Sequence, residues 1–164
     1  MKQINKAAVL GAGVMGATIA AHLANAGIQV VLLDIASKEA SDAEKKAGCT
    51  IQDPKVRNRI ALAGLEGLKK MKPEPFYLPD YSENITVGNF DDNMEELRSC
   101  DWVVEVVIEN MAIKKQLFSE KVVPYLKEGA ILSTNTSGLS INEMAECLPE
   151  NIRKNLLVTH FFNP

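Results

Sequence analysis

A glycine-rich turn lies between an apolar run and a small-residue helix near the amino end of the chain. The apolar run covers residues 7–10, and the predicted helix spans about Val14 to Ala26. The turn reads Gly11, Ala12, Gly13, Val14, Met15 and Gly16. In this pattern the first glycine allows a sharp turn, the second lets a ligand approach the backbone, and the third lets the helix pack closely on the strand. The chain therefore begins with a strand–turn–helix unit that suits a phosphate-bearing ligand.

A second apolar run ends in an acidic residue. Gly27 stands where a helix end favours positive φ, residues 28–33 are apolar apart from Gln29, and Asp34 follows. An acid at this position accepts hydrogen bonds from the hydroxyls of an adenosine ribose and repels a 2′-phosphate. The pattern therefore predicts NAD as the cofactor, rather than NADP. The alternative is a glycine turn beside a structural aspartate.

Further apolar runs recur along the chain. They cover residues 85–87, 102–107, 130–133 and 156–159. Continuous apolar runs that alternate with helices are typical of strands buried on both faces of a parallel sheet. The pattern predicts a Rossmann-type, doubly wound α/β fold with a mostly parallel sheet, and 164 residues suffice for one such domain.

The stretch from about residue 37 to residue 80 predicts a helical insert. Pro54 divides it into two helix-prone parts, because proline disfavours helix at the residue before it. The apolar residues of the first part are Ala40, Ala43, Ala47 and Ile51, and those of the second are Val56, Ile60, Leu65 and Leu68. We expect a helical hairpin that projects from the sheet.

Composition limits the remaining classes. The net charge of −3 gives no reason to expect nucleic acid as a partner, and the longest apolar runs are too short to span a membrane. No secretory or transit signal is visible, and three widely spaced cysteines indicate reduced thiols in a cytoplasmic protein. With only two histidines in the chain, no metal site is predicted.

Polar residues follow the strand predicted over residues 102–107. Glu109 and Asn110 lie at its carboxyl end, and Lys114 belongs to the next helix. Ligands of doubly wound folds bind at this edge of the sheet. A structural alternative is equally open, in which the two polar residues cap the helix and Lys114 is a surface charge.

A polar loop follows the strand predicted over residues 130–133. Ser140 and Glu143 form a capping box for the next helix, so Ser140 is assigned a structural role. That assignment leaves Asn135, Thr136 and Ser137 free for a ligand at the carboxyl edge. A simple polar turn is the alternative.

His160 ends the last predicted strand, at the same edge of the sheet. An imidazole exchanges protons near neutral pH, which suits a general base that takes a proton from an alcohol. An isolated histidine at a strand end is more often structural. The neighbouring motifs favour the catalytic interpretation.

These motifs together resemble the 3-hydroxyacyl-CoA dehydrogenase family. The resemblance rests on Gly11 to Gly16, on Glu109-Asn110, on Asn135 to Ser137, and on the His-Phe-Phe-Asn-Pro sequence of residues 160–164. It covers nearly the whole chain, with a weaker match over residues 37–80.

The resemblance implies a role for each matching residue. His160 corresponds to the family's general base, and Ser137 to a serine that contacts the substrate near the nicotinamide. Glu109 and Lys114 correspond to residues that contact NAD. Asn163 would hold the histidine region together, which makes it the third member of the predicted catalytic set.

The family also has features beyond the end of this sequence. A glutamate further along the chain orients the histidine, and an all-helical C-terminal domain forms the dimer interface and much of the acyl-CoA cleft. We therefore expect residues 1–164 to be an NAD-binding domain, inactive alone, of an enzyme that is a homodimer when complete. Lys45, Lys46, Lys55, Arg57 and Arg59 are candidates to face the CoA phosphates, with a solvated charged face as the alternative.

The implied reaction is the NAD-dependent oxidation of (S)-3-hydroxyacyl-CoA to 3-oxoacyl-CoA in fatty-acid β-oxidation, with acyl-CoA as the substrate. Two alternatives stay open at this point. One is a related NAD-dependent dehydrogenase of another hydroxy acid. The other is a non-catalytic NAD-binding module, against which the polar set Ser137, His160 and Asn163 argues.

Overall fold

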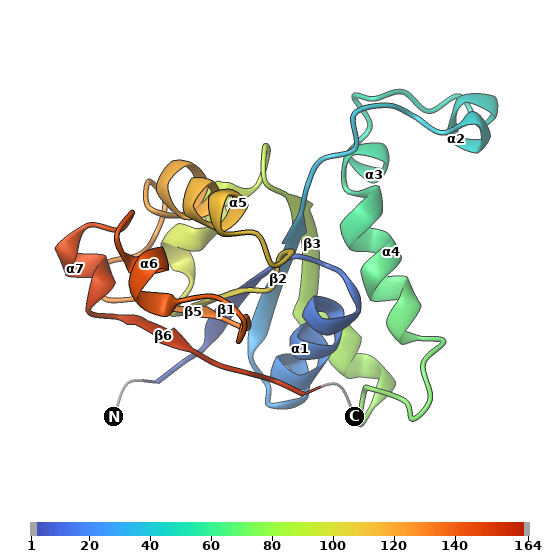
Figure 1. The fold of residues 1–164 in the computed structure, drawn as a ribbon. Coiled ribbons are helices and arrows are strands. Elements are labelled where there is room, and N and C mark those ends of the chain that lie inside the picture. Colours follow the sequence, from blue (N-terminus) through green and yellow to red (C-terminus); the bar gives the residue numbers. More distant parts are fainter. Residues whose placement is uncertain (1–2, 163–164) are drawn as a thin grey trace.

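The computed structural model describes residues 3–162, and these residues form one parallel sheet covered by helices on both faces (Figure 1). The strands are β1 (Lys6–Leu10), β2 (Gln29–Asp34), β3 (Ile85–Asn89), β4 (Trp102–Glu105), β5 (Ile131–Thr134) and β6 (Leu156–Val158). Their order across the sheet is β3-β2-β1-β4-β5-β6, and every pair is parallel. This is the strand order of the classic Rossmann fold, so the predicted fold class is confirmed.

The central strand β1 shows how the two layers form. Its side chains alternate between the faces, because successive residues of a strand point in opposite directions. Ala7 and Val9 lie in one core cluster with α1 (Val14–Asn25), whereas Ala8 and Leu10 lie in the other. The second cluster includes buried residues of η2 (Met94–Ser99), η3 (Leu117–Val122) and α6 (Ile141–Ala145). Burial on both faces explains why the strand sequences read as continuous apolar runs.

Shorter helices complete the connections. They are α2 (Asp42–Lys46), α3 (Pro54–Arg57), α4 (Arg59–Leu68), η1 (Pro79–Asn84), α5 (Met111–Gln116) and α7 (Glu150–Arg153). The predicted insert corresponds to the connection between β2 and β3, which contains α2, α3, α4 and η1.

The insert projects from the body at only one end. Helix α2 has no buried residue and stands away from the sheet, as predicted (Figure 1). It is short because Ser41 caps its beginning and Gly48, at φ +79°, follows its end. The apolar face expected for its part of the insert therefore does not form, and only Ala40 of that set is buried.

Helix α4, by contrast, packs along α1. Its residues Ala61 and Leu68 are buried in the core on that side of the sheet. A Cβ atom at Gly64 would lie 2.3 Å from the Ala12 carbonyl oxygen, so only glycine allows this approach. The second half of the insert is thus part of the body, in direct contact with the glycine turn.

Candidate functional site

The glycine turn between β1 and α1 has two glycines that the packing requires. Gly11 has φ +108°, and a Cβ there would lie 2.6 Å from the Val106 carbonyl oxygen. A Cβ at Gly16 would lie 1.8 Å from the Gly11 carbonyl oxygen. The first and third positions of the pattern therefore hold the turn, the helix and the loop after β4 together, as the sequence predicts.

Gly13 differs from both, because it faces open space. Apart from its two neighbours in the chain, a Cβ at this residue would meet no atom within 4 Å. It is the N-cap residue of the 12-residue helix α1, it makes no side-chain cap, and the first turn of that helix contains no acidic residue. The first N–H groups of a helix have no partner within it, and they attract anions. This surface fits a pyrophosphate group, and Val14 and Met15 continue it along the first turn.

Asp34 lies beside the turn at the end of β2. Its Oδ2 accepts a hydrogen bond from the Ala12 N–H at 2.5 Å, and its Oδ1 accepts one from the Ile35 N–H at 2.7 Å. The side chain remains partly exposed. The carboxylate therefore fixes the glycine turn and still faces the edge where the ribose hydroxyls are predicted to bind.

The loops after β4 and β5 meet at the same edge. The Asn110 side chain accepts a hydrogen bond from the Ile113 N–H at 3.1 Å and caps α5, so the structural interpretation is correct for this residue. Glu109 is exposed, and its Oε2 would lie 3.3 Å from a Cβ on Gly138. The contact of Glu109 with the cofactor stays a prediction.

Lys114 is fully buried, so the surface-charge alternative for it is wrong. Its Nζ donates to Glu105 Oε1 at 2.6 Å and to the Val107 carbonyl oxygen at 3.0 Å. Glu105 itself is also fully buried. Glu105 was not among the residues predicted from the sequence, although a glutamate in an otherwise apolar strand with a lysine nine residues further on is a usable signal.

The loop after β5 connects to the segment that carries His160. The Asn135 side-chain Oδ1 accepts a hydrogen bond from the Phe161 N–H at 2.7 Å. Ser137 is exposed, and the Ser140 hydroxyl accepts from the Glu143 N–H at 3.3 Å, as expected of a cap. Asn135 therefore orders the backbone next to His160, whereas its predicted contact with the cofactor is untested.

His160 follows β6 and is exposed at the carboxyl edge. The Thr159 N–H before it donates to the Thr134 carbonyl oxygen at 3.0 Å, which continues the pairing of β6 with β5. Its ring meets the Phe162 ring edge to face at 4.7 Å between centroids, and Phe161 packs against the α1 side of the core. The segment is thus anchored on both sides of an accessible imidazole. Asn163 lies outside the described residues.

Comparison with known proteins agrees with this geometry. Residues 6–164 match the model of the family described as "3-hydroxyacyl-CoA dehydrogenase, NAD binding domain".

The chain belongs to the 3-hydroxyacyl-CoA dehydrogenase family.

Relatives of this chain come from several organisms. A probable 3-hydroxyacyl-CoA dehydrogenase of Bacillus subtilis is 47% identical over 99% of the chain. A putative fatty acid oxidation complex trifunctional enzyme of Rickettsia felis is 43% identical, also over 99%. The chain spans 20% of the length of each of these relatives. Among solved structures, 3-hydroxybutyryl-CoA dehydrogenase of Escherichia coli K12 is 28% identical, with a TM-score of 0.67 over 99% of this chain and 30% of the other.

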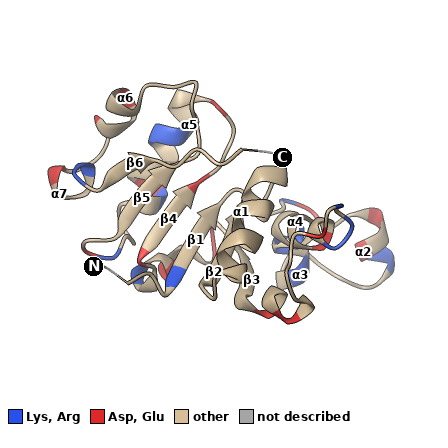
Figure 2. Cartoon of the chain, turned by 90° about the horizontal axis from the view of Figure 1, so that it is seen from below, with Lys and Arg blue, Asp and Glu red and all other residues tan. Residues whose placement is uncertain are grey.

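The insert between β2 and β3 carries both signs of charge (Figure 2). Arg57 forms two hydrogen bonds with Asp92, at 2.5 and 2.8 Å, which lower the pKa of that carboxyl group. Arg59 pairs with Glu44 of α2. Two of the five basic residues proposed to face CoA phosphates are therefore already matched by carboxylates, which favours the alternative of a solvated charged face for these two.

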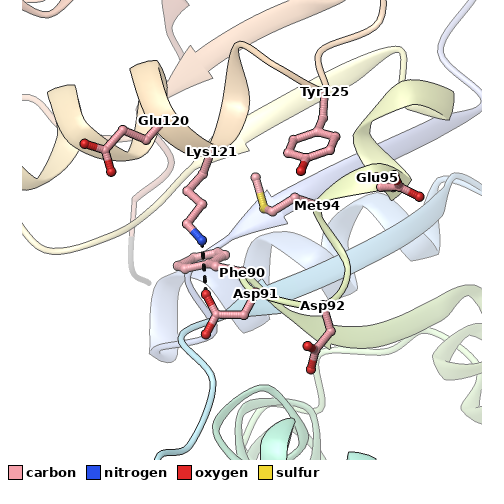
Figure 3. Close-up of a pocket in the computed structure, with 8 residues that line it drawn as sticks. All are labelled: Phe90, Asp91, Asp92, Met94, Glu95, Glu120, Lys121 and Tyr125. Carbon is pink, nitrogen blue, oxygen red and sulfur yellow. Dashed lines mark hydrogen bonds and ion pairs between the residues drawn. The ribbon is translucent and has the colours of Figure 1, made fainter.

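A separate cavity of about 330 Å³ lies between the loop after β3 and η3 (Figure 3). Its lining includes four carboxylates, from Asp91, Asp92, Glu95 and Glu120, and one lysine, which pairs with Asp91 at 3.1 Å. A lining with excess negative charge repels phosphate groups. This cavity therefore does not suit a dinucleotide.

The described residues give little support for a reactive cysteine, a disulfide or a metal site. Burial raises the pKa of the Cys100 thiol to about 11 and also raises that of Cys147, so both stay protonated at neutral pH. The three cysteines form no disulfide. Over residues 3–162, no group of three histidine, cysteine or acidic side chains is arranged to hold a metal ion, and no helix is long and apolar enough to cross a membrane.

Proposed function

We propose that this chain is the cofactor-binding part of an enzyme that oxidises (S)-3-hydroxyacyl-CoA to 3-oxoacyl-CoA with NAD, in the breakdown of fatty acids. The observation that carries the proposal is the exposed imidazole of His160 at the carboxyl edge that also bears the open glycine turn. A cofactor site and a proton acceptor at one edge are the two parts that an alcohol dehydrogenase of this type requires.

Most of the predicted site residues contact the cofactor in this proposal. Gly11 to Gly16 and the start of α1 receive the pyrophosphate, and Asp34 binds the ribose and excludes a 2′-phosphate. When bound, the nicotinamide supplies the hydride chemistry, as in other enzymes of this class. Glu109 and Lys114 belong to the loop and helix along which the cofactor extends.

His160 takes the proton of the 3-hydroxyl group at an imidazole nitrogen. Ser137 donates a hydrogen bond to the same substrate oxygen, and Asn163 steadies the histidine segment. Asn135 already holds the neighbouring Phe161 N–H, so the imidazole starts from an ordered backbone. This arrangement removes a proton while the alcohol carbon is held against the cofactor.

The test compares the two histidines of the chain in the full-length protein. We expect His160→Gln to lower kcat with (S)-3-hydroxybutyryl-CoA by about 10²–10⁴-fold, the usual contribution of a general base. NADH affinity should change by no more than about twofold, because that variant removes an interaction with the substrate only. The measurements are NADH formation by absorbance and NADH binding by calorimetry.

His22→Gln is the comparison variant: His22 is exposed on α1 and its ring meets the Phe161 ring edge-on at 6.1 Å between centroids, so its effect on turnover should be small beside that of His160→Gln. Free (S)-3-hydroxybutyrate serves as the comparison substrate and tests the hydroxy-acid alternative. Normal turnover by His160→Gln, or a preference for the free acid, would contradict the proposal.

A further inference from the structure

The buried residue Glu105 makes hydrogen bonds to three different parts of the carboxyl edge. Its Oε1 accepts from the Val107 N–H and from Lys114 Nζ, both at 2.6 Å. Its Oε2 accepts from the Thr134 hydroxyl at 2.6 Å. One side chain at the end of β4 thus joins the loop after β4, the helix α5 and the end of β5.

The contacts of Thr134 extend this network to the His160 segment. Its hydroxyl accepts from the Thr136 N–H at 3.2 Å, and its carbonyl oxygen accepts from the Thr159 N–H at 3.0 Å. The Glu105 carbonyl oxygen accepts from the Asn135 N–H at 2.8 Å. Because Asn135 in turn holds the Phe161 N–H, a continuous set of hydrogen bonds runs from the loop after β4 to the residue that follows His160.

The network also reaches the glycine turn. The Val106 N–H donates to the Leu10 carbonyl oxygen at 2.8 Å, and the Val106 carbonyl oxygen is the atom that a Cβ at Gly11 would strike. The loop between Glu105 and Val107 is therefore held by the Glu105 carboxylate and also packs against the glycine turn.

An ion pair in this position is costly unless every polar atom has a partner. Both carboxylate oxygens of Glu105 accept hydrogen bonds, and Lys114 Nζ makes two. Apolar residues of matching size would fill the same space without this cost, but they would not set the loop after β4 and the loop after β5 in one arrangement.

We propose that Glu105 is a positioning residue that aligns the cofactor-binding loop after β4 with the His160 segment, with Lys114 as its counter-ion and the Thr134 hydroxyl as its link to β5. This inference rests on the proposed function. It assigns Lys114 an indirect effect on the cofactor through the Val107 carbonyl and Glu105.

Thr134 gives the sharpest test, because Glu105→Gln leaves a buried ammonium without its counter-ion and can fail to fold. Thr134→Val keeps the branched shape and removes the hydroxyl, whereas Thr134→Ser keeps the hydroxyl. Thr86→Val makes the same change at an exposed position on β3, away from the site. All three variants are made in the full-length protein.

We expect Thr134→Val to lower kcat for 3-hydroxyacyl-CoA oxidation by about tenfold or more, since small displacements of reacting groups are expensive in rate. NADH affinity should stay within about threefold of the parent, because the glycine turn and Asp34 are unchanged. Thr134→Ser and Thr86→Val should both behave like the parent.

Hydrogen–deuterium exchange gives a readout that does not depend on turnover. We expect Thr134→Val to speed exchange in residues 106–110 and in residues 159–162, although neither the Val107 nor the Phe161 N–H bonds to Thr134. A parent-like kcat in Thr134→Val, equal impairment of Thr134→Val and Thr134→Ser, or faster exchange confined to residues 134–137 would overturn the proposal. If the parent protein does not oxidise 3-hydroxyacyl-CoA, the proposed function fails, and the exchange comparison still decides whether Glu105 couples the two segments.

Discussion

The two ends of strand β4 are both marked by a buried acid, yet they serve opposite purposes. At the amino edge of the sheet, Asp101 Oδ2 accepts from the Asn5 and Lys6 N–H groups at 3.0 and 3.3 Å, and its Oδ1 accepts from Lys127 Nζ at 2.7 Å. These bonds connect the start of β4 to the start of β1 and to Lys127, so the polar groups at this edge are paired within the chain. At the carboxyl edge, Glu105 is fully buried and both of its carboxylate oxygens accept hydrogen bonds. The side chains of Glu109, Ser137 and His160 at the same edge are exposed.

The amino edge therefore contributes to the stability of the fold, whereas the carboxyl edge has room for a ligand. The polar groups at the amino edge bind one another, so changes there should act on unfolding. At the carboxyl edge, Gly13 faces open space and the side chains of Glu109, Ser137 and His160 are exposed, so changes at these residues should act on ligand binding.

Gly13→Val should have the largest effect and should separate the two edges most clearly. The side chain enters open space at negative φ, so the fold accepts it, but it occupies the surface that the pyrophosphate needs. We expect NADH affinity to fall by about 100-fold or more with little change in melting temperature. Calorimetric titration and circular dichroism measure the two quantities.

Gly67→Val is the control for this variant, because Gly67 also faces open space, in helix α4. It should bind NADH normally. Undiminished binding by Gly13→Val would show that the turn is not the phosphate site.

Asp101→Asn should show the reverse pattern. It removes a charged acceptor from the Lys127 ammonium, so we expect the free energy of unfolding to fall by about 1–3 kcal/mol. NADH affinity should be unchanged, since this edge is remote from the turn. Urea unfolding of the parent and of Asp101→Asn measures the loss of stability. Weaker NADH binding at unchanged stability would contradict the assignment of the amino edge to stability.

The same carboxylate gives a dependence on pH. The hydrogen bond from Lys127, followed by those from the Asn5 and Lys6 N–H groups, holds the pKa of Asp101 down to about 2, against the opposing effect of burial. Because the folded pKa is below the unfolded one, its stabilising contribution is complete above about pH 4 and is lost as the pH falls towards 2. We expect the stability difference between the parent and Asp101→Asn to shrink over this interval, as followed by urea unfolding at each pH. A constant difference would mean that the charge has no part in it.

Asp34→Ala should have the smallest and most mixed effect, because Asp34 serves both binding and the local structure. Losing the acceptor for the Ala12 N–H loosens the glycine turn, and losing the charge removes the repulsion of a 2′-phosphate. We expect the preference for NADH over NADPH to narrow by about tenfold, with NADH binding weakened. Titration with both cofactors tests this, and an unchanged preference would remove Asp34 from the specificity site.

The sequence was most informative where the signal is local. The strands agree with the predicted apolar runs to within about two residues, because burial on both faces demands such runs. The turn glycines, the cap at Ser140 and the glycine after α1 also follow from short-range rules, and Gly27 has φ +78° as expected.

Long-range partners were not predictable in the same way. The Glu105–Thr134 and Asn135–Phe161 bonds join residues 29 and 26 positions apart, and the sequence has no feature that specifies either pairing. The packing of α4 on the body also escaped prediction. The sequence predicted a hairpin that projects from the sheet, whereas the fit of α4 depends on the absence of a side chain at Gly64 and on the surface that this helix meets.

That fit limits how the domain can be rebuilt. Because the Gly64 backbone lies against the Ala12 carbonyl oxygen, the surfaces of the insert and of the glycine turn are complementary to each other. A chimera that takes the insert from a relative with a larger residue at this position would push the turn itself out of place. Transplants intended to change substrate preference should therefore exchange residues 11–16 and 54–68 as a single unit.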